Sequence, residues 1–260
     1  MRSLRIERAG TILTALVRDG AGTPLVLVPG VMADAESWLP VVERIEAPNP
    51  VVVVNRRGRT PSGPVGEGYT VRTEVDDLHG FLDDLGGEAH LFGWSYGGLI
   101  AAETAVERRD LRSLTLYEPV AAPFVAEYVA PLRAAAASGD PGRAVEIVNR
   151  DVSGFSTEYV DELRRGPAWP TLVRLAAPLA EELAAINAHN PAYDRYRDLE
   201  TSVTLIVGER SEGGDPYGEP FARFVAAFPR ASVTRMTGQG HLAHVHAPDV
   251  LGTHITDAVR

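Results

Sequence analysis

The chain has 260 residues, of which 45 % are hydrophobic and none is cysteine, and its formal net charge at pH 7 is −10. This length suits one large domain or a domain with an insertion, while the lack of cysteine excludes disulfides, zinc–thiolate sites and cysteine nucleophiles. The acidic balance argues against nucleic acid as a partner, and no apolar run approaches the roughly 18 residues of a membrane span. The first residues carry no long apolar core, so we expect no signal peptide and a cytoplasmic location.

Strand-like runs and helical patterns alternate over the first 117 residues. Thr70 can cap a helix that runs to about Leu85, because apolar side chains recur on one face of this segment. This alternation indicates a mostly parallel sheet with helices on both faces, in which ligands gather at the carboxyl ends of the strands. We expect strands at 4–7, 12–18, 25–28, 51–54, 89–92 and 111–117, with the first two joined at Ala9-Gly10.

The alternation stops after Pro119. Residues 123–200 contain no convincing strand and many prolines, and this segment is interpreted as a helical cap inserted into a core formed by residues 1–122 and 201–260. Strands are expected again at 203–207 and 231–236. The expected helices lie near 124–137, 142–150 and 172–188 in the cap, and at 220–228 and 248–259 in the core.

A Gly-x-Ser-x-Gly pattern, Gly93 to Gly97, lies between a predicted strand and a predicted helix. A serine squeezed between strand and helix must lie on a sharp turn, which glycines on either side permit because they have no Cβ. The turn exposes the hydroxyl of Ser95 and places it at a helix N-terminus, where the N–H of Tyr96 can face a developing oxyanion. These features are typical of a nucleophile elbow, and they predict that Ser95 is a nucleophile.

A serine hydroxyl is a weak nucleophile at pH 7, so it needs a general base. His241 follows the last predicted strand in a glycine-rich loop that can aim an imidazole, and it is the predicted base. His244 and His246 are close enough in sequence to suggest a metal cluster, but no carboxylate motif or cysteine completes such a site. We therefore expect no metal and no cofactor.

The sequence resembles the α/β-hydrolase superfamily over nearly the whole chain, and four segments carry this resemblance. The resemblance implies an α/β-hydrolase fold with a mostly parallel eight-stranded sheet and a serine nucleophile. Two positions depart from the family's pattern, since Pro29 replaces the usual histidine and Ser211 occupies a position where many members have aspartate. The segments are Leu25-Val26-Leu27-Val28-Pro29-Gly30 with Trp38 downstream, Val54-Asn55-Arg56-Arg57-Gly58, Gly93-Trp94-Ser95-Tyr96-Gly97-Gly98 and Gly238-Gln239-Gly240-His241.

The sequence leaves more than one candidate for the acid that orients His241. Glu118 ends a strand 23 residues after Ser95, and its position is similar to that of the acid in zearalenone-lactonase-type hydrolases. The serine at position 211 favours the same assignment. The alternatives lie in the loop after residue 207, and they are Asp215, Glu212 and Glu209.

Backbone groups complete the predicted machinery. By position, the N–H of Val31 is the second oxyanion donor beside that of Tyr96, with Met32 as a neighbouring alternative. The Arg56, Arg57 and Arg59 cluster is interpreted as part of a structural loop, because no glycine-rich phosphate-binding loop follows any predicted strand. Candidate apolar contacts for a substrate are Trp94, Tyr128, Phe155, Trp169 and Tyr193.

These features predict a serine hydrolase that cleaves an ester or lactone bond of an apolar small molecule through Ser95, His241 and Glu118. The alternatives are a C–C bond hydrolase, a perhydrolase or a cyclase on the same scaffold, and a ligand-binding protein that has no turnover. The expected partner is a small-molecule substrate, with neither nucleic acid nor membrane, and a homodimer stays open.

Overall fold

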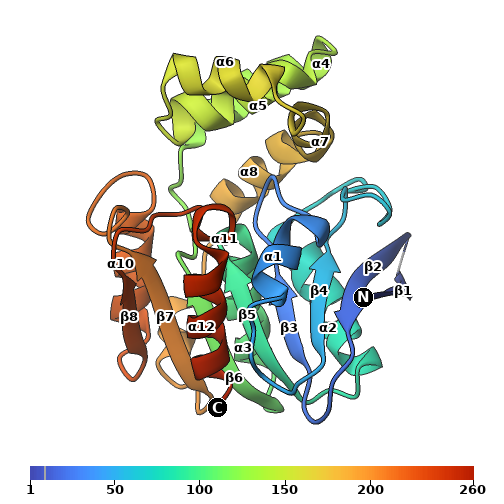
Figure 1. The fold of residues 1–260 in the computed structure, drawn as a ribbon, viewed down its shortest axis with the longest axis vertical. Coiled ribbons are helices and arrows are strands. Elements are labelled where there is room, and N and C mark those ends of the chain that lie inside the picture. Colours follow the sequence, from blue (N-terminus) through green and yellow to red (C-terminus); the bar gives the residue numbers. More distant parts are fainter. Residues whose placement is uncertain (9) are drawn as a thin grey trace.

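The computed structural model describes residues 1–8 and 10–260, so Ala9 of the predicted first turn lies outside the described residues (Figure 1). Within these residues, eight strands form one sheet in the order β1-β2-β4-β3-β5-β6-β7-β8. The pairs β1–β2 and β2–β4 are antiparallel, and every other neighbouring pair is parallel. The strands lie within two residues of their predicted positions: β1 (Arg2–Arg8), β2 (Thr11–Arg18), β3 (Leu25–Val28), β4 (Val51–Asn55), β5 (Ala89–Trp94), β6 (Leu111–Tyr117), β7 (Ser202–Gly208) and β8 (Ser232–Met236).

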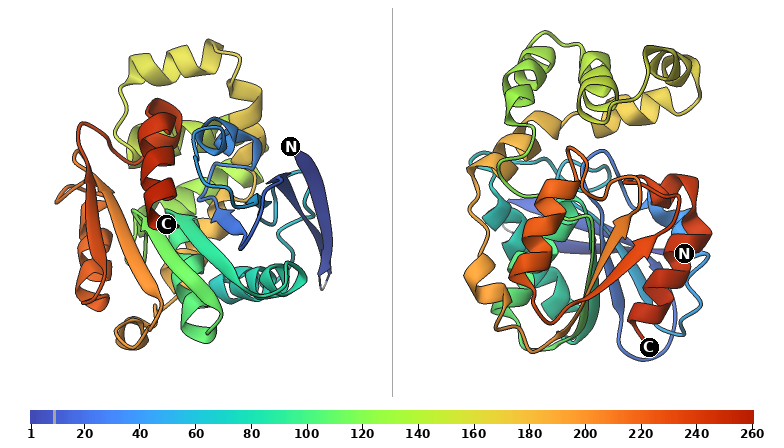
Figure 2. Two further views of the ribbon diagram at one scale, coloured as in Figure 1. Left: turned by 60° about the horizontal axis from the view of Figure 1, so that its bottom comes forward. Right: turned by 90° about the vertical axis from the view of Figure 1, so that its left-hand side faces the viewer.

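Helices cover both faces of the sheet (Figure 2). The helices α2, α3 and α10 contribute to one apolar core, while α1, α11 and α12 contribute to the core on the opposite face. The core helices are η1 (Glu36–Trp38), α1 (Leu39–Val42), α2 (Val71–Asp84), α3 (Tyr96–Glu107), α10 (Gly218–Ala227), α11 (Ala243–His246) and α12 (Pro248–Ala258).

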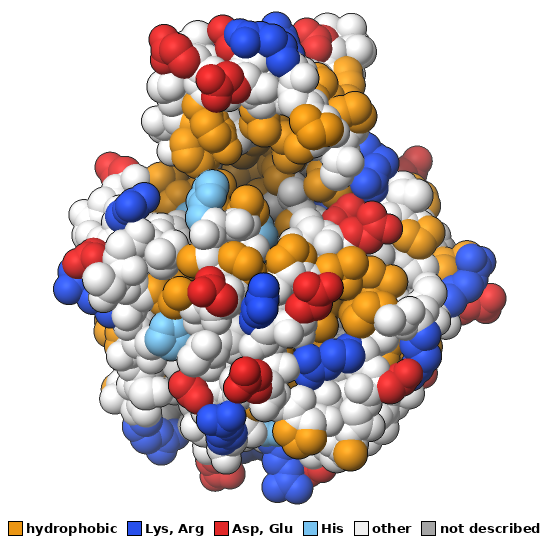
Figure 3. Space-filling view, viewed as in Figure 1, with side chains coloured by type: hydrophobic (Ala, Val, Ile, Leu, Met, Phe, Trp, Pro, Cys, Tyr) orange, Lys and Arg blue, Asp and Glu red, His pale blue; other side chains and the backbone are white. Residues whose placement is uncertain are grey.

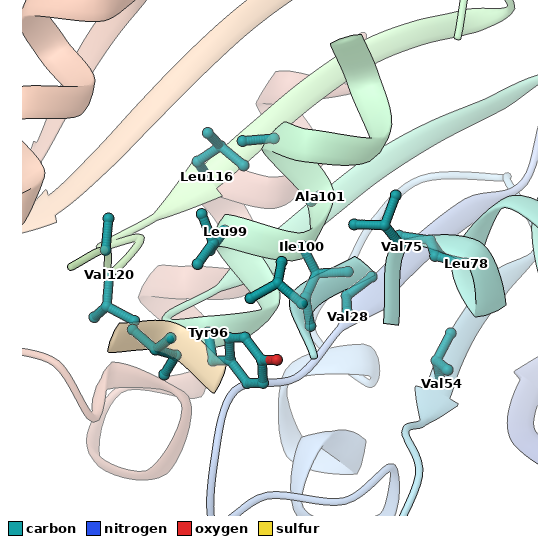
Figure 4. Packing of buried hydrophobic residues seen from close by; sticks show 14 of the residues in the cluster. Val28, Val54, Val75, Leu78, Tyr96, Leu99, Ile100, Ala101, Leu116 and Val120 are labelled. Atoms are coloured by element: carbon teal, nitrogen blue, oxygen red, sulfur yellow. The ribbon is translucent and has the colours of Figure 1, made fainter. Parts of the chain in front are cut away.

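The two cores follow from the two-residue period of the strands. In β3, Val26 and Val28 belong to the core beneath α2 and α3, whereas Leu25 and Leu27 belong to the opposite core. A central parallel strand is buried on both faces, which explains why its sequence is continuously apolar. Figure 4 shows Leu99 and Ile100 of α3 among the packed side chains of the first core.

The segment between β6 and β7 is helical, and most of it stands above the carboxyl ends of the parallel strands (Figure 1). The prediction of one helix over 172–188 is wrong, because the helix ends at Leu175 and a new one begins after Pro178, which lacks an N–H to continue the ladder. The sequence analysis also missed α6, whose first turn is capped by the Ser156 hydroxyl. The elements are η2 (Ala126–Tyr128), α4 (Val129–Ala137), α5 (Pro141–Glu146), the π-helix η3 (Ile147–Val152), α6 (Thr157–Arg165), α7 (Trp169–Leu175), α8 (Leu179–Ala188) and α9 (Tyr193–Tyr196).

Candidate active site

Ser95 lies on a strained turn between β5 and α3. Its φ of 56° and ψ of −122° are rarely adopted by residues with a side chain, and such conformations typically cost about 1–3 kcal/mol. The backbone around it is packed too closely for any Cβ at the two glycines of the motif. A Cβ at Gly93 would lie 2.4 Å from the carbonyl oxygen of Gly97, and one at Gly97 would lie 2.0 Å from that of Val28. The glycines therefore allow the turn that brings Ser95 to the cavity wall.

The structure brings His241 and Glu118 into direct contact. Nδ1 of His241 donates a hydrogen bond of 2.6 Å to Oε2 of Glu118, whose side chain is fully buried. The other carboxylate oxygen accepts a 2.8 Å hydrogen bond from the Gly208 N–H at the end of β7. A carboxylate on Nδ1 leaves Nε2 of the imidazole as the atom that can accept a proton.

The three alternative acids are exposed, and among the described residues none of them forms a hydrogen bond or ion pair with His241. Glu212 forms an ion pair of 2.6 Å with Arg235. Glu209 accepts a hydrogen bond of 2.7 Å from the Gly238 N–H. Of the four carboxylates considered, Glu118 is therefore the one that can orient the imidazole.

Two aromatic rings pack against the imidazole of His241. Tyr217 stacks on it with ring centroids 3.6 Å apart and planes at 10°, and the ring of Trp94 lies at 5.0 Å. The indole N–H of Trp94 donates to the carbonyl oxygen of His241 at 3.0 Å. The sequence analysis missed Tyr217. The one sequence feature that could have indicated its role is that an aromatic residue occurs in an otherwise acidic loop. The Tyr217 hydroxyl lies 3.4 Å from that of Ser153, so Tyr217 also connects His241 with the helical segment between β6 and β7.

The two predicted oxyanion donors lie beside Ser95. Tyr96 is the first residue of α3, so its N–H has no acceptor within the helix. Val31 and Met32 line the same cavity as Ser95, and the Val31 N–H donates to none of the described residues. A Cβ on Gly30 would lie 2.8 Å from Cβ of Ser95, which shows how closely this loop approaches the serine.

An apolar cavity of about 290 Å³ lies between the helical segment that joins β6 to β7 and the carboxyl edge of the sheet. Figure 3 shows this face of the molecule hollowed below the same helical segment, with hydrophobic side chains around the opening. Among the described residues that line it, none is Asp, Glu, Lys or Arg. The wall residues besides those already discussed are Val120, Phe124, Val125, Leu132, Val148, Asn149, Val152, Tyr159, Leu163, Ala168, Leu172, Leu179, Leu183, Ile186, Leu242, His244, Val245 and His246.

Of the five aromatic residues considered as substrate contacts, Trp94 lines this cavity. The other four lie outside its wall. Trp169 packs beneath the guanidinium of Arg164, Phe155 packs on Tyr159, and Tyr193 packs against Tyr196 and Phe224. Tyr128 lies half-buried at the end of η2.

His244 is a buried side chain in the cavity wall. Its ring stacks parallel to Trp38 with centroids 5.1 Å apart, and its Nδ1 has no hydrogen-bond partner among the described residues. Burial, followed by the nearby His241 and His246, lowers the pKa of His244 to about 3. In the part of the chain that the structure describes, no group of three or more His, Asp or Glu side chains is arranged to hold a metal ion.

We expect His244→Phe to remove part of the acid sensitivity of the fold. As pH falls from 8 to 5, the unfolded histidine binds a proton near its ordinary pKa of 6.5 while the folded one stays neutral, so wild-type stability falls. The loss from this residue is about 2 kcal/mol, at about 1.4 kcal/mol per pH unit below 6.5. Urea unfolding at both pH values measures it, with Val245→Phe as a control that leaves every titratable group in place. An equal loss of stability in wild type and His244→Phe would contradict this account.

The comparisons with known proteins identify the family to which this fold belongs. The model of the alpha/beta hydrolase family matches residues 25–252. The chain belongs to the alpha/beta hydrolase family. Among the described residues, no helix has the length and the hydrophobicity that a membrane span requires.

Solved structures of other hydrolases share this fold. An alpha/beta hydrolase from Sphaerobacter thermophilus has a TM-score of 0.83 at 23 % identity and covers 99 % of this hydrolase and 100 % of its own chain. The enol-lactonase from Burkholderia xenovorans has a TM-score of 0.81 at 19 % identity, and the match covers 98 % of this chain and 99 % of the enol-lactonase chain.

A curated relative is similar over most of the sequence. The polyketide synthase ThaQ of Burkholderia thailandensis is 26 % identical over 255 residues, which cover 91 % of this hydrolase. The hydrolase spans only 12 % of the length of that synthase.

Proposed function

We propose that this hydrolase cleaves esters or lactones of neutral, apolar acids, with Ser95 as nucleophile, His241 as base and Glu118 as the acid that orients it. The observation that carries the proposal is the 2.6 Å hydrogen bond between His241 and Glu118 at the wall of the cavity that Ser95 also lines. Residues 123–200 act as a cap that supplies most of the apolar wall. The name of the enol-lactonase that shares the fold agrees with a lactone as one form of the substrate.

The proposed reaction has two acyl-transfer steps. Nε2 of His241 takes the proton of Ser95 while its Oγ attacks the substrate carbonyl, and the N–H groups of Val31 and Tyr96 stabilise the oxyanion. The imidazolium then protonates the leaving alcohol, or the ring oxygen of a lactone, and an acyl-enzyme forms. Water, deprotonated by the same imidazole, attacks the acyl-enzyme and releases the acid.

The wall of the cavity predicts the charge of the substrate. A carboxylate on the acyl chain would lose its hydration in a wall whose described residues include neither Lys nor Arg, and an unpaired buried charge costs several kcal/mol. We expect kcat/KM for a neutral nitrophenyl ester, such as the hexanoate, to exceed that for a hemi-ester of a dicarboxylic acid of equal length by about 100-fold or more. Steady-state hydrolysis of the two esters, followed by released nitrophenol, measures this ratio.

The same experiment separates the alternatives. Equal rates for the two esters would contradict a neutral substrate but not serine chemistry. A fluorophosphonate that labels Ser95 in the absence of any ester or lactone turnover would favour the C–C hydrolase, perhydrolase or cyclase alternative. Failure of both labelling and turnover in folded protein would favour a ligand-binding role.

A further inference from the structure

Arg56 is a buried arginine that does not line the active-site cavity yet binds the loop beside Ser95. Its Nε donates to the carbonyl oxygen of Pro29 at 2.8 Å, and one terminal nitrogen donates to that of Gly30 at 2.8 Å. Only 2 % of the side chain of Arg56 is exposed. The loop that it binds is the one that carries the proposed oxyanion donor Val31.

Peptide geometry connects this contact with the oxyanion hole. The carbonyl of Gly30 and the N–H of Val31 belong to one planar peptide unit, in which the two groups point in opposite directions when the bond is trans. That bond is trans, since the cis bonds among the described residues all precede proline. Arg56 holds the Gly30 carbonyl oxygen on the side of the peptide that faces the guanidinium. This contact fixes the plane of the peptide, so the Val31 N–H points away from Arg56. A guanidinium on the carbonyl also polarises the unit and strengthens the N–H as a donor.

The second donor lies against the same guanidinium. The Arg56 guanidinium carbon is 4.8 Å from the ring centroid of Tyr96, whose backbone N–H is the other proposed oxyanion donor. The Tyr96 hydroxyl lies 3.2 Å from that of Tyr69, and the Tyr69 hydroxyl donates to Glu74 at 2.6 Å. Glu74 in turn accepts a 2.8 Å hydrogen bond from Arg56. The two donor residues are thus held by one connected set of buried groups.

A helix of the cap completes this set. Glu182 on α8 is fully buried and accepts from Arg56 at 2.6 Å and from Arg59 at 2.8 Å. The same helix contributes Leu179, Leu183 and Ile186 to the wall of the substrate cavity. The helix α8 therefore lines the substrate cavity with apolar side chains and binds Arg56 through the carboxylate of Glu182.

We propose that Arg56 is a positioning residue that sets the direction of the oxyanion donors, and that Glu182 fixes it from the cap. This inference rests on the proposed acyl-transfer function. It predicts a loss in the transition state with little loss in substrate binding, because Arg56 touches the backbone that faces the oxyanion and does not line the cavity.

The test compares Arg56→Lys with Arg59→Lys. Both variants keep a positive charge in the buried cluster, but Arg59 donates to Ala33 and Glu182 and not to the carbonyl oxygens of Pro29 and Gly30. Lysine cannot reproduce the fork of donors that binds two carbonyl oxygens and two carboxylates together. Thermal unfolding of both variants measures their loss of stability. For Arg56→Lys we expect kcat on the neutral nitrophenyl ester to fall about 10- to 100-fold, with KM within about threefold of wild type.

A trifluoromethyl ketone supplies a readout that lost stability alone does not change. It forms a charged hemiketal with the serine, so its inhibition constant should rise by about the same factor as kcat falls in Arg56→Lys. In Arg59→Lys both quantities should stay within about threefold of wild type. Should Arg56→Lys not fold, Glu74→Gln, which removes one carboxylate from Arg56, should show the same pattern in weaker form.

Two results would overturn the inference. The first is a fall of kcat that is equal in Arg56→Lys and Arg59→Lys. If Arg56→Lys does not fold, the same comparison is made between Glu74→Gln and Arg59→Lys. The second is a change in KM with no change in kcat. Wild-type protein that neither turns over esters nor reacts at Ser95 would instead overturn the proposed function, and this inference with it.

Discussion

Replacing Ser95 by alanine is expected to lower kcat/KM for the neutral ester about 10⁴- to 10⁶-fold. The substitution removes the atom that forms the acyl-enzyme, and losses of this size are typical when a serine nucleophile is deleted from an intact site. The oxyanion donors are backbone groups, so the small remaining rate would be due to them and to binding. Rates with the neutral nitrophenyl ester and intact-mass detection of a fluorophosphonate adduct measure both consequences.

Ser211 provides the matched control. It is a buried serine like Ser95, but it lies in the loop after β7 and does not line the cavity. Ser211→Ala should therefore keep the adduct and most of the activity. An adduct that persists in Ser95→Ala, or activity within tenfold of wild type, would show that another residue is the nucleophile.

Replacing Glu118 by glutamine is expected to lower kcat about 10³- to 10⁴-fold while the protein stays folded. Glutamine has nearly the same shape, and its carbonyl oxygen can still accept from the Gly208 N–H. Its amide would then donate to Nδ1 of His241, which places the ring proton on Nε2. That tautomer cannot accept the proton of Ser95, so the base is lost although the imidazole stays in place.

Asp215→Asn tests whether Asp215, rather than Glu118, is the acid that orients His241. This carboxylate is exposed, so its neutralisation should change kcat by less than about threefold. Burst kinetics with the nitrophenyl ester at pH 7 to 9 can be compared for the two variants. A large loss in Asp215→Asn together with a small one in Glu118→Gln would reassign the acid and contradict the geometry described above.

The elements that the sequence predicts well are those with a local cause. The strands β3, β4 and β5 are short apolar runs ended by proline, glycine or polar residues, and the two-residue period places their side chains in the two cores. Ser95 could be located because the glycines that its turn requires lie two residues before it and two residues after it in the sequence. His241 could be located because a loop after the last strand reaches the same edge of the sheet.

The features that the sequence did not predict depend on distant contacts. Nothing near Arg56 indicates that Glu182, 126 residues further along the chain, will bind it. Tyr217 stacks on His241 only because the loop after β7 folds back over the sheet edge, and the pattern of that loop is merely polar. The choice of the acid also required knowledge of contacts between distant parts of the chain. All four candidates follow strands that end at the carboxyl edge of the sheet, and they are Glu118, Asp215, Glu212 and Glu209.

A long helical segment separates two neighbouring strands of the sheet, and this arrangement has a consequence for synthesis on the ribosome. Residues 118–201 separate β6 from β7, yet these strands are neighbours, and the N–H of Glu118 donates to the Ile206 carbonyl. A nascent chain that has emerged as far as the cap holds the elbow serine but exposes an unpaired edge at β6 and has no imidazole to activate that serine. Such edges recruit other strands, so this interval is when the growing polypeptide most needs chaperone protection. By the proposed mechanism, the serine becomes reactive only after translation has passed β8 and the histidine loop has been synthesised.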